Sequence, residues 1–132
     1  MMKNIAEWLS RDWDDLLQKY PESRPLLSYF MDYFSTCAGK DNFIDMIKLA
    51  IRKEGASIQE VADYSFTNDV TDDGERVDVV EFYFNGELDG TVPVKMFVEV
   101  FEIIALAYAE YNPEDKEQII HLIPRLEQAY GI

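Results

Sequence analysis

The fold is decided by residues 60–89, which read EVADYSFTNDVTDDGERVDVVEFYFNGELD. Apolar and polar residues alternate on both sides of a turn predicted at 68–74, and this alternation is typical of β-strands. The apolar residues that share one face are Ile58, Ala62, Tyr64 and Phe66 in the first strand and Val80, Phe82 and Phe84 in the second. Asn85-Gly86 predicts a tight hairpin turn into a third strand at 88–92. The sequence therefore predicts a small antiparallel three-stranded sheet, with helices covering one face.

The same stretch carries ten acidic residues and a single basic one, Arg76. Like charges at close range repel one another, so a hairpin of this composition is hard to explain as scaffold alone. We interpret it as part of a surface that binds a basic partner. The residues predicted to contact that partner are Asp63, Tyr64, Asp69, Asp72, Asp73, Glu75, Asp78, Glu81, Tyr83, Glu87 and Asp89.

Two tyrosines within this set are the candidate anchors of the interface. Exposed ion pairs contribute only about 0–1 kcal/mol each, so affinity has to come from a few desolvated groups. Tyr64 and Tyr83 are the aromatic residues best placed among the acids. The alternative is that both rings pack against neighbouring strands of the sheet.

Helical periodicity surrounds the sheet on both sides. Three N-terminal helices are predicted over residues 5–20, 25–37 and 41–55, with Asp12 at the rim of the first and Asp41 or Asn42 capping the third. Residues 94–111 are apolar nearly all round, which predicts a helix central to the core. A last helix is predicted to open with Asn112 as its cap and to kink or shorten at Pro124. The prediction is an α+β fold, with residues 1–132 forming one domain.

Composition limits the classes of function. The net charge is −14, and residues 57–132 hold seventeen acids against four bases. This balance argues against direct binding of nucleic acid and suits a basic protein surface, although acidity can also serve solubility alone. Charged residues interrupt the apolar run at 92–111, so no membrane span is predicted. The N-terminus does not read as a signal peptide, and Cys37 is alone, so we expect a cytoplasmic protein without disulfides.

No catalytic, cofactor or metal site is predicted. His121 is the only histidine and forms no zinc-type set with Cys37. The turn from Asp69 to Gly74 approaches a calcium loop, but Val80 stands where a bidentate glutamate is required and strands flank the turn. We therefore read it as an acidic turn.

Two strings point to a known family. Glu81-Phe82-Tyr83-Phe84 lies in an antiparallel segment, and Tyr111-Asn112-Pro113-Glu114-Asp115-Lys116 joins the closing pair of helices. Over residues 75–132 this pattern resembles the immunity proteins of bacterial contact-dependent growth inhibition (CDI) systems, in particular those that neutralise ribonuclease toxins. The resemblance implies a cytoplasmic, non-catalytic protein that binds the C-terminal nuclease domain of a CDI effector and covers its active site or an adjoining surface.

Two other hypotheses stay open at the level of sequence. An acidic chain can imitate DNA and occupy the groove of a nucleic-acid-binding enzyme, which requires evenly spaced carboxylates along one edge. A small enzyme can use a pair of carboxylates, which requires a pocket that raises the pKa of one of them.

Overall fold

The computed structural model describes residues 4–36, 43–58, 62–70 and 76–132. Within these ranges it has an α+β fold with five α-helices and a four-stranded antiparallel sheet in the order β1-β2-β3-β4. The prediction of three strands is wrong by one. Ile58 pairs with Ala62, so these residues belong to two neighbouring antiparallel strands and not to one continuous strand.

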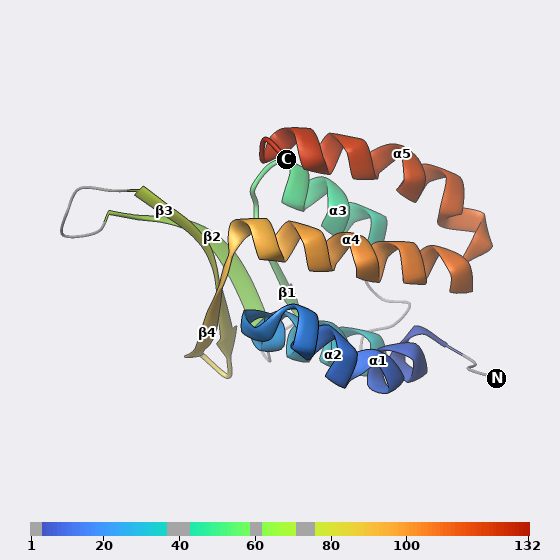
Figure 1. Ribbon diagram of the computed structural model, residues 1–132, viewed down its shortest axis with the longest axis horizontal. Coiled ribbons are helices and arrows are strands. Elements are labelled where there is room, and N and C mark those ends of the chain that lie inside the picture. The colour runs from blue at the N-terminus through green and yellow to red at the C-terminus, as the bar shows by residue number, and fades with distance from the viewer. Residues whose placement is uncertain (1–3, 37–42, 59–61, 71–75) are drawn as a thin grey trace.

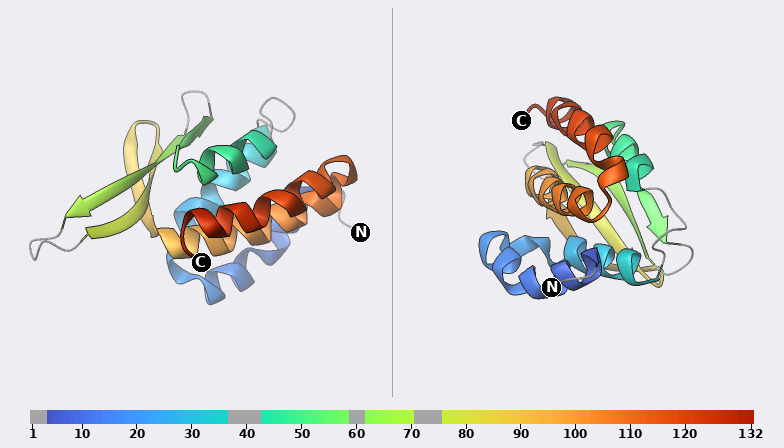
Figure 2. Two further views of the ribbon diagram at one scale, coloured as in Figure 1. Left: turned by 90° about the horizontal axis from the view of Figure 1, so that it is seen from above. Right: turned by 90° about the vertical axis from the view of Figure 1, so that its right-hand side faces the viewer.

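The elements follow the chain in a simple order (Figure 1). They are α1 (Ile5–Lys19), a 3₁₀ turn η1 (Pro21–Ser23), α2 (Arg24–Thr36), α3 (Phe43–Ile51), β1 (Ala56–Ile58), β2 (Ala62–Val70), β3 (Arg76–Phe84), β4 (Glu87–Pro93), α4 (Val94–Tyr111) and α5 (Pro113–Ala129). The helices lie on one side of the sheet, with α4 between the α1–α2 pair and the α3–α5 pair (Figure 2). The far ends of β2 and β3 project beyond the helices.

The two ends of helix α1 are set by a capping residue at its start and by a proline after its end. Asn4 accepts a hydrogen bond at Oδ1 from the backbone N–H of Glu7 at 2.9 Å, which satisfies one of the free donors of the first turn. The helix ends at Lys19, with Tyr20 as its C-cap, and Pro21 then opens η1. Asp12 lies half-buried at the rim, as predicted, and pairs with Arg11 at 2.7 Å.

The core is built from aromatic rings of three helices and the sheet. Phe101 of α4 lies 5.3 Å from the ring of Phe30 in α2 and 5.8 Å from that of Phe43 in α3. On the sheet, Tyr64 lies 5.5 Å from Phe97 of α4. The central place predicted for α4 is confirmed, but α2 shares it. The buried residues of α2 include Leu26, Leu27, Tyr29, Phe30, Tyr33 and Phe34.

The predictions for the last helix were less accurate. Asn112 occupies the N-cap position of α5, as predicted, but its side chain makes no capping hydrogen bond there. Its Nδ2 donates to the carbonyl oxygen of Tyr108 at 3.0 Å. It therefore closes the C-terminal end of α4. Pro124 does not end α5, which continues to Ala129. The predicted caps Asp41 and Asn42, and the single cysteine, Cys37, lie outside the described residues.

Candidate interaction surface

The strand alternation divides the sheet into a helix-covered face and an outward face. Tyr64 and Phe82 are buried beneath the helices, so Asp63 and Tyr83 must point the other way. The antiparallel register places Asp63 opposite both Ser57 and Tyr83. We call this side, defined by Ser57, Asp63, Ser65, Glu81 and Tyr83, the outward face.

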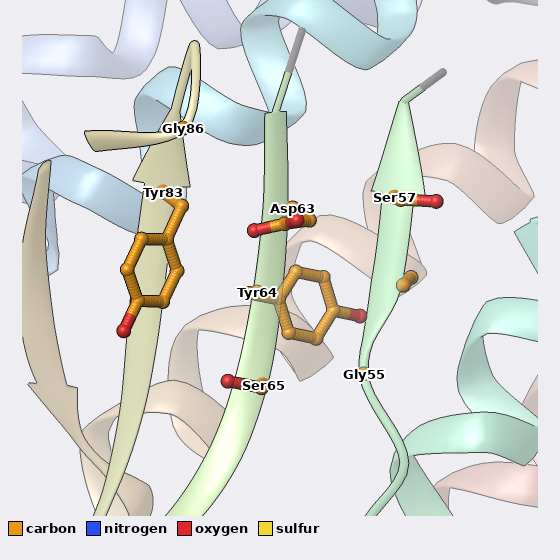
Figure 3. Close-up of a pocket in the computed structure, with 8 residues that line it drawn as sticks. Gly55, Ser57, Asp63, Tyr64, Ser65, Tyr83 and Gly86 are labelled. Carbon is orange, nitrogen blue, oxygen red and sulfur yellow. The ribbon is translucent and has the colours of Figure 1, made fainter. Parts of the chain in front are cut away.

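A shallow hollow of about 500 Å³ lies on the outward face (Figure 3). Three strands form it, because its lining comes from β1, β2 and β3 and from the turn that follows β3. The residues that line it are Gly55, Ala56, Ser57, Asp63, Tyr64, Ser65, Tyr83 and Gly86. Its exposed side chains are two hydroxyls and one carboxylate, and the half-buried phenol ring of Tyr83 lies beside them, a set suited to polar contacts with a partner protein.

Tyr83 is held in place by a neighbour on the same strand. Its hydroxyl donates a hydrogen bond to Oε2 of Glu81 at 3.2 Å, and both side chains are half-buried. The bond restricts the ring and the carboxylate to one arrangement, so less side-chain entropy remains to be lost when a partner binds. Asp63, Glu81 and Tyr83, which the sequence predicted as contact residues, are thus brought together.

Tyr64 is placed differently from its prediction. Only 2% of its surface is exposed, because it shares the buried parity with Phe82, whose ring centroid lies 5.3 Å away. The packing alternative therefore holds for this ring, which is not available as a surface anchor. Its hydroxyl is buried with no hydrogen-bond partner among the described residues, and burial raises its pKa.

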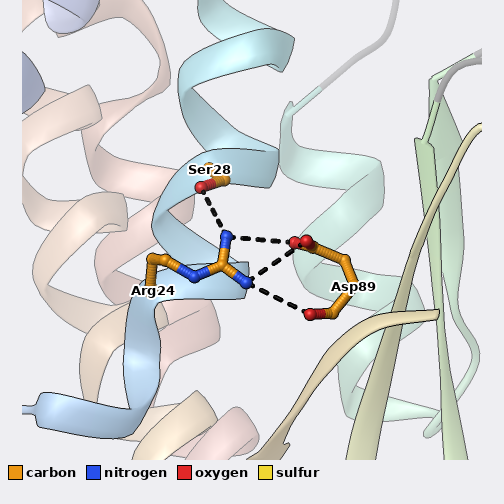
Figure 4. A network of polar contacts seen from close by, with 3 residues as sticks. All are labelled: Arg24, Ser28 and Asp89. Carbon is orange, nitrogen blue, oxygen red and sulfur yellow. Dashed lines mark hydrogen bonds and ion pairs between the residues drawn. The ribbon is translucent and has the colours of Figure 1, made fainter.

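Asp89 is paired within the fold and does not add a free charge to the surface (Figure 4). Its Oδ1 lies 3.2 Å from Nη2 of Arg24, and the same nitrogen donates to the Asp89 carbonyl oxygen at 3.1 Å. Nη1 of Arg24 donates to Asp89 Oδ2 at 3.3 Å and to Ser28 Oγ at 3.4 Å. This network joins β4 to α2, so Asp89 is neutralised within the fold. Glu87, at the start of β4, is exposed.

The remaining predicted contacts belong to the far end of the hairpin. Asp69 pairs with Val77 and Asp78 with Asn68 in the ladder between β2 and β3, on the part of the sheet that extends past the helices. Their side chains, and residues Asp72, Asp73 and Glu75, lie outside the described residues, as does most of the turn compared with a calcium loop.

Sequence reasoning predicted the turn of the second hairpin but missed the two exposed apolar residues beside it. Asn85 and Gly86 have φ values of 52° and 81°, so the predicted tight turn is confirmed. Beside it Phe84 is 40% exposed and Leu88 is 56% exposed, although Phe84 has the parity of the buried face. The sequence contained a signal for this exposure, because Phe84 and Leu88 flank the Asn85-Gly86 turn. Residues next to a hairpin turn lie at the edge of the area that the helices cover.

One half-buried acidic residue, Glu102, lies away from the sheet. Burial, together with the neighbouring carboxylates of Glu127 and Glu99, raises the pKa of Glu102 on α4 to about 7. One of its oxygens is buried without a hydrogen-bond donor among the described residues. Glu102 does not line the hollow on the outward face.

Two properties of the described residues concern metal ions and membranes. No three histidine, cysteine or acidic side chains among them are arranged to hold a metal ion. No helix in the described part of the chain has both the length and the apolar character needed to cross a membrane.

Comparison with known proteins gives a match at the level of a family. Residues 14–123 match a family model described as CDI immunity protein. The match includes the sheet and most of the helices. No curated protein and no solved structure matches the chain.

Proposed function

The chain belongs to the CDI immunity protein family, and from this premise we propose that it neutralises a cationic nuclease toxin, of the ribonuclease type, by binding it through the outward face. The partner in this proposal is the C-terminal domain of the cognate CDI effector. The encounter takes place in the cytoplasm, which agrees with a chain that has a single cysteine.

Charge complementarity supports a nuclease as the partner. Nucleases hold phosphate, so their substrate clefts are lined with lysine and arginine. The immunity protein has a net charge of −14, concentrated in residues 57–132. Opposite surface charges accelerate the encounter of two proteins and guide the docking orientation.

One observation carries the proposal: the convergence of Asp63, Glu81 and Tyr83 on a face that the described helices leave open. Tyr83 supplies a restrained aromatic contact, while Asp63 supplies an exposed charge. A toxin seated on this face and on the projecting hairpin would have its own basic cleft covered. Inhibition then follows from exclusion of the RNA substrate, without any chemistry by the immunity protein.

The test uses the toxin domain encoded beside this gene, purified in complex and then separated from the immunity protein. Asp63→Lys should slow association about tenfold at low salt, and the difference should shrink as ionic strength rises. Glu117→Lys, an equal charge change on an exposed position of α5, serves as the control and should stay within about twofold. The isolated toxin should also degrade RNA, and the immunity protein should suppress that activity.

Two results would contradict the proposal. If Asp63→Lys and Glu117→Lys associated at the same rate as the parent, the outward face would not be the docking surface. If the toxin domain had no nuclease activity, the assignment of its class would be wrong.

A further inference from the structure

The register of the sheet brings four side chains of the outward face into a square. Asp63 of β2 pairs with Tyr83 of β3, and two residues along the same strands Ser65 pairs with Glu81. Side chains that pair across antiparallel strands lie on the same face, as do side chains two residues apart on one strand. Asp63 and Glu81 therefore occupy one diagonal of the square, while Ser65 and Tyr83 occupy the other. We call these four residues the polar square.

The polar square borders the hollow of about 500 Å³ on the outward face. Asp63, Ser65 and Tyr83 line this hollow, and in Figure 3 the Asp63 carboxylate and the Ser65 hydroxyl both point toward the strand of Tyr83. The hydroxyl of Tyr83 donates to Oε2 of Glu81 at 3.2 Å, so the second carboxylate lies beside the phenol ring. Two carboxylates, a hydroxyl and an aromatic ring are thus presented together.

The two carboxylates of the polar square have no cationic partner among the described residues. The ion pairs within the described part of the chain all involve other acidic residues. The two bases just before β1 are engaged elsewhere, because Nε of Arg52 lies 3.2 Å from Oε2 of Glu54 and Nζ of Lys53 lies 5.3 Å from the centre of the Tyr130 ring. The polar square therefore presents two negative charges that the described residues do not neutralise.

The spacing of the two carboxylates favours one kind of cation. Diagonal neighbours on paired strands lie roughly 7 Å apart, so a single group placed between them can meet both. A guanidinium carries five N–H donors in a planar fork, and its two sides can each pair with one carboxylate. The ammonium of lysine is a compact point charge with three donors and does not present two opposed sets of donors. Charge and spacing therefore both fit arginine.

An apolar border lies on the other side of Tyr83. Leu88 of β4 pairs with Tyr83 and is 56% exposed. The stem of an arginine packs on aromatic and aliphatic surface of this kind, and a partner that covers Leu88 keeps water away from the ion pairs, which strengthens them. We infer that the polar square receives an arginine of the toxin, whose guanidinium bridges the carboxylates of Asp63 and Glu81 beside the ring of Tyr83.

This inference rests on the proposed function and names the toxin group that the outward face takes. Removing one partner of a desolvated charge pair mainly raises the dissociation rate. Asp63→Asn and Glu81→Gln should each raise the dissociation rate of the complex about tenfold, because either change leaves the arginine with a single carboxylate. Tyr83→Phe should raise it about threefold, since Glu81 loses the hydrogen bond that restrains it. Biolayer interferometry with immobilised toxin measures these rates.

Matched controls exist on helices away from the sheet. Asp14→Asn on α1 and Glu117→Gln on α5 neutralise exposed carboxylates without changing their size, and Tyr111→Phe on α4 removes the hydroxyl of another half-buried tyrosine. All three should leave dissociation within about twofold of the parent. Asp63→Asn and Glu81→Gln also preserve side-chain size, so they decide the question even if Tyr83→Phe lowers stability.

Double-mutant cycles identify the toxin side chain. Each surface arginine of the toxin is changed to lysine or methionine and combined with Asp63→Asn or with Glu81→Gln. One arginine should lose most of its effect on dissociation when either carboxylate is already replaced, because it contacts both. Lysine at that position should raise dissociation about fivefold, whereas lysine at the other arginines should stay within about twofold.

Two results would overturn the inference. No toxin arginine might as well be present at the site if none coupled to both Asp63 and Glu81. If lysine replaced the coupled arginine without loss, a point charge would suffice and the bridging geometry would be wrong.

The proposed function and the bridging arginine fail in different ways. A slower association of Asp63→Lys, together with parent-like dissociation of Glu81→Gln, would keep the outward face as the docking surface and remove the arginine. If Asp63→Lys and Glu81→Gln both behaved like the parent, the docking surface and the arginine would both be wrong.

Discussion

Gly55 lies where β1 passes closest to β2. A Cβ atom at this position would stand 1.9 Å from the carbonyl oxygen of Tyr64 and 2.9 Å from its carbonyl carbon, and backbone atoms cannot move aside cheaply. Gly55→Ala should therefore destabilise the protein by roughly 1–3 kcal/mol. Urea unfolding measures this, with Ser57→Ala on the exposed side of β1 as the control. Equal midpoints for the two variants would show that β1 does not pack as described.

Glu102 makes stability depend on pH. Its pKa is raised from 4.5 to about 7 in the folded protein, first by burial and then by Glu127. The folded state thus binds more protons than the unfolded state between these values, so the free energy of unfolding should fall as pH rises from about 4.5 to 7. Solvent screens part of the interaction, and we expect a loss of about 1 kcal/mol.

Glu102→Gln tests this assignment, because glutamine has no charge to desolvate and can donate a hydrogen bond to Glu127. The variant should be the more stable protein at pH 8, and its advantage should vanish near pH 4.5. Thermal unfolding across this range is the measurement, with Glu117→Gln as a control that should show no such trend. A constant difference between Glu102→Gln and the parent at all pH values would assign the dependence to another group.

The candidate contacts illustrate how far residue-level prediction extends. Alternation placed Asp63 and Tyr83 on one face and Tyr64 on the other, because the side-chain period of a strand is two. It did not say which face the helices cover, so both tyrosines were retained as anchors. The face that is covered depends on the apolar faces of α2 and α4, and in the structure the helices cover the face of Tyr64. Tyr83 as an anchor stays a prediction.

At the scale of elements, packing more than charge should hold β4 against α2. A Cβ on Gly90 would lie 2.7 Å from Cγ of Pro25, the residue that follows Arg24 in α2. Gly90→Ala should therefore cost roughly 1–3 kcal/mol, because the strand has to move away from the helix. Asp89→Asn should cost less, about 0–1 kcal/mol, since the ion pair with Arg24 is partly exposed.

Chemical denaturation of Gly90→Ala and Asp89→Asn at two salt concentrations shows which variant loses more stability. The penalty of Asp89→Asn should shrink at high salt, whereas that of Gly90→Ala should persist. A larger penalty for Asp89→Asn would mean that the ion-pair network, and not close packing, positions β4.

Element boundaries were predicted well where one local signal controls them. The turn at Asn85-Gly86 needs two residues with positive φ, a demand that the sequence states directly. The division of the first predicted strand into β1 and β2 was missed, because residues of both strands continue one alternating pattern. The position of Asn112 before α5 was predicted correctly, but the hydrogen bond of its side chain was not, because Asn112 lies between two helices and its Nδ2 donates to the preceding one.

At the scale of the whole molecule, net charge should govern how fast the complex forms. With a charge of −14, the immunity protein should associate with its toxin roughly ten times more slowly at 0.5 M salt than at 0.02 M, while dissociation changes little. Stopped-flow mixing across a salt series measures both rate constants. A salt-independent association rate would show that acidity serves solubility and not recognition.

The sequence by itself determined the periodicity of each helix and strand, the tight turn before β4, and the acidic balance that favours a basic partner. The periodicity and the turn follow from residues close together in the sequence, and the acidic balance follows from counting charged residues. None of them requires knowledge of the packing. Only the tertiary structure decided that Tyr64 is buried, that Asp89 is matched by Arg24, and that Phe84 stays partly exposed beside Trp13. The physical reason is distance along the chain: these contacts join residues from separate elements, and their geometry exists only after the helices have settled on one face of the sheet.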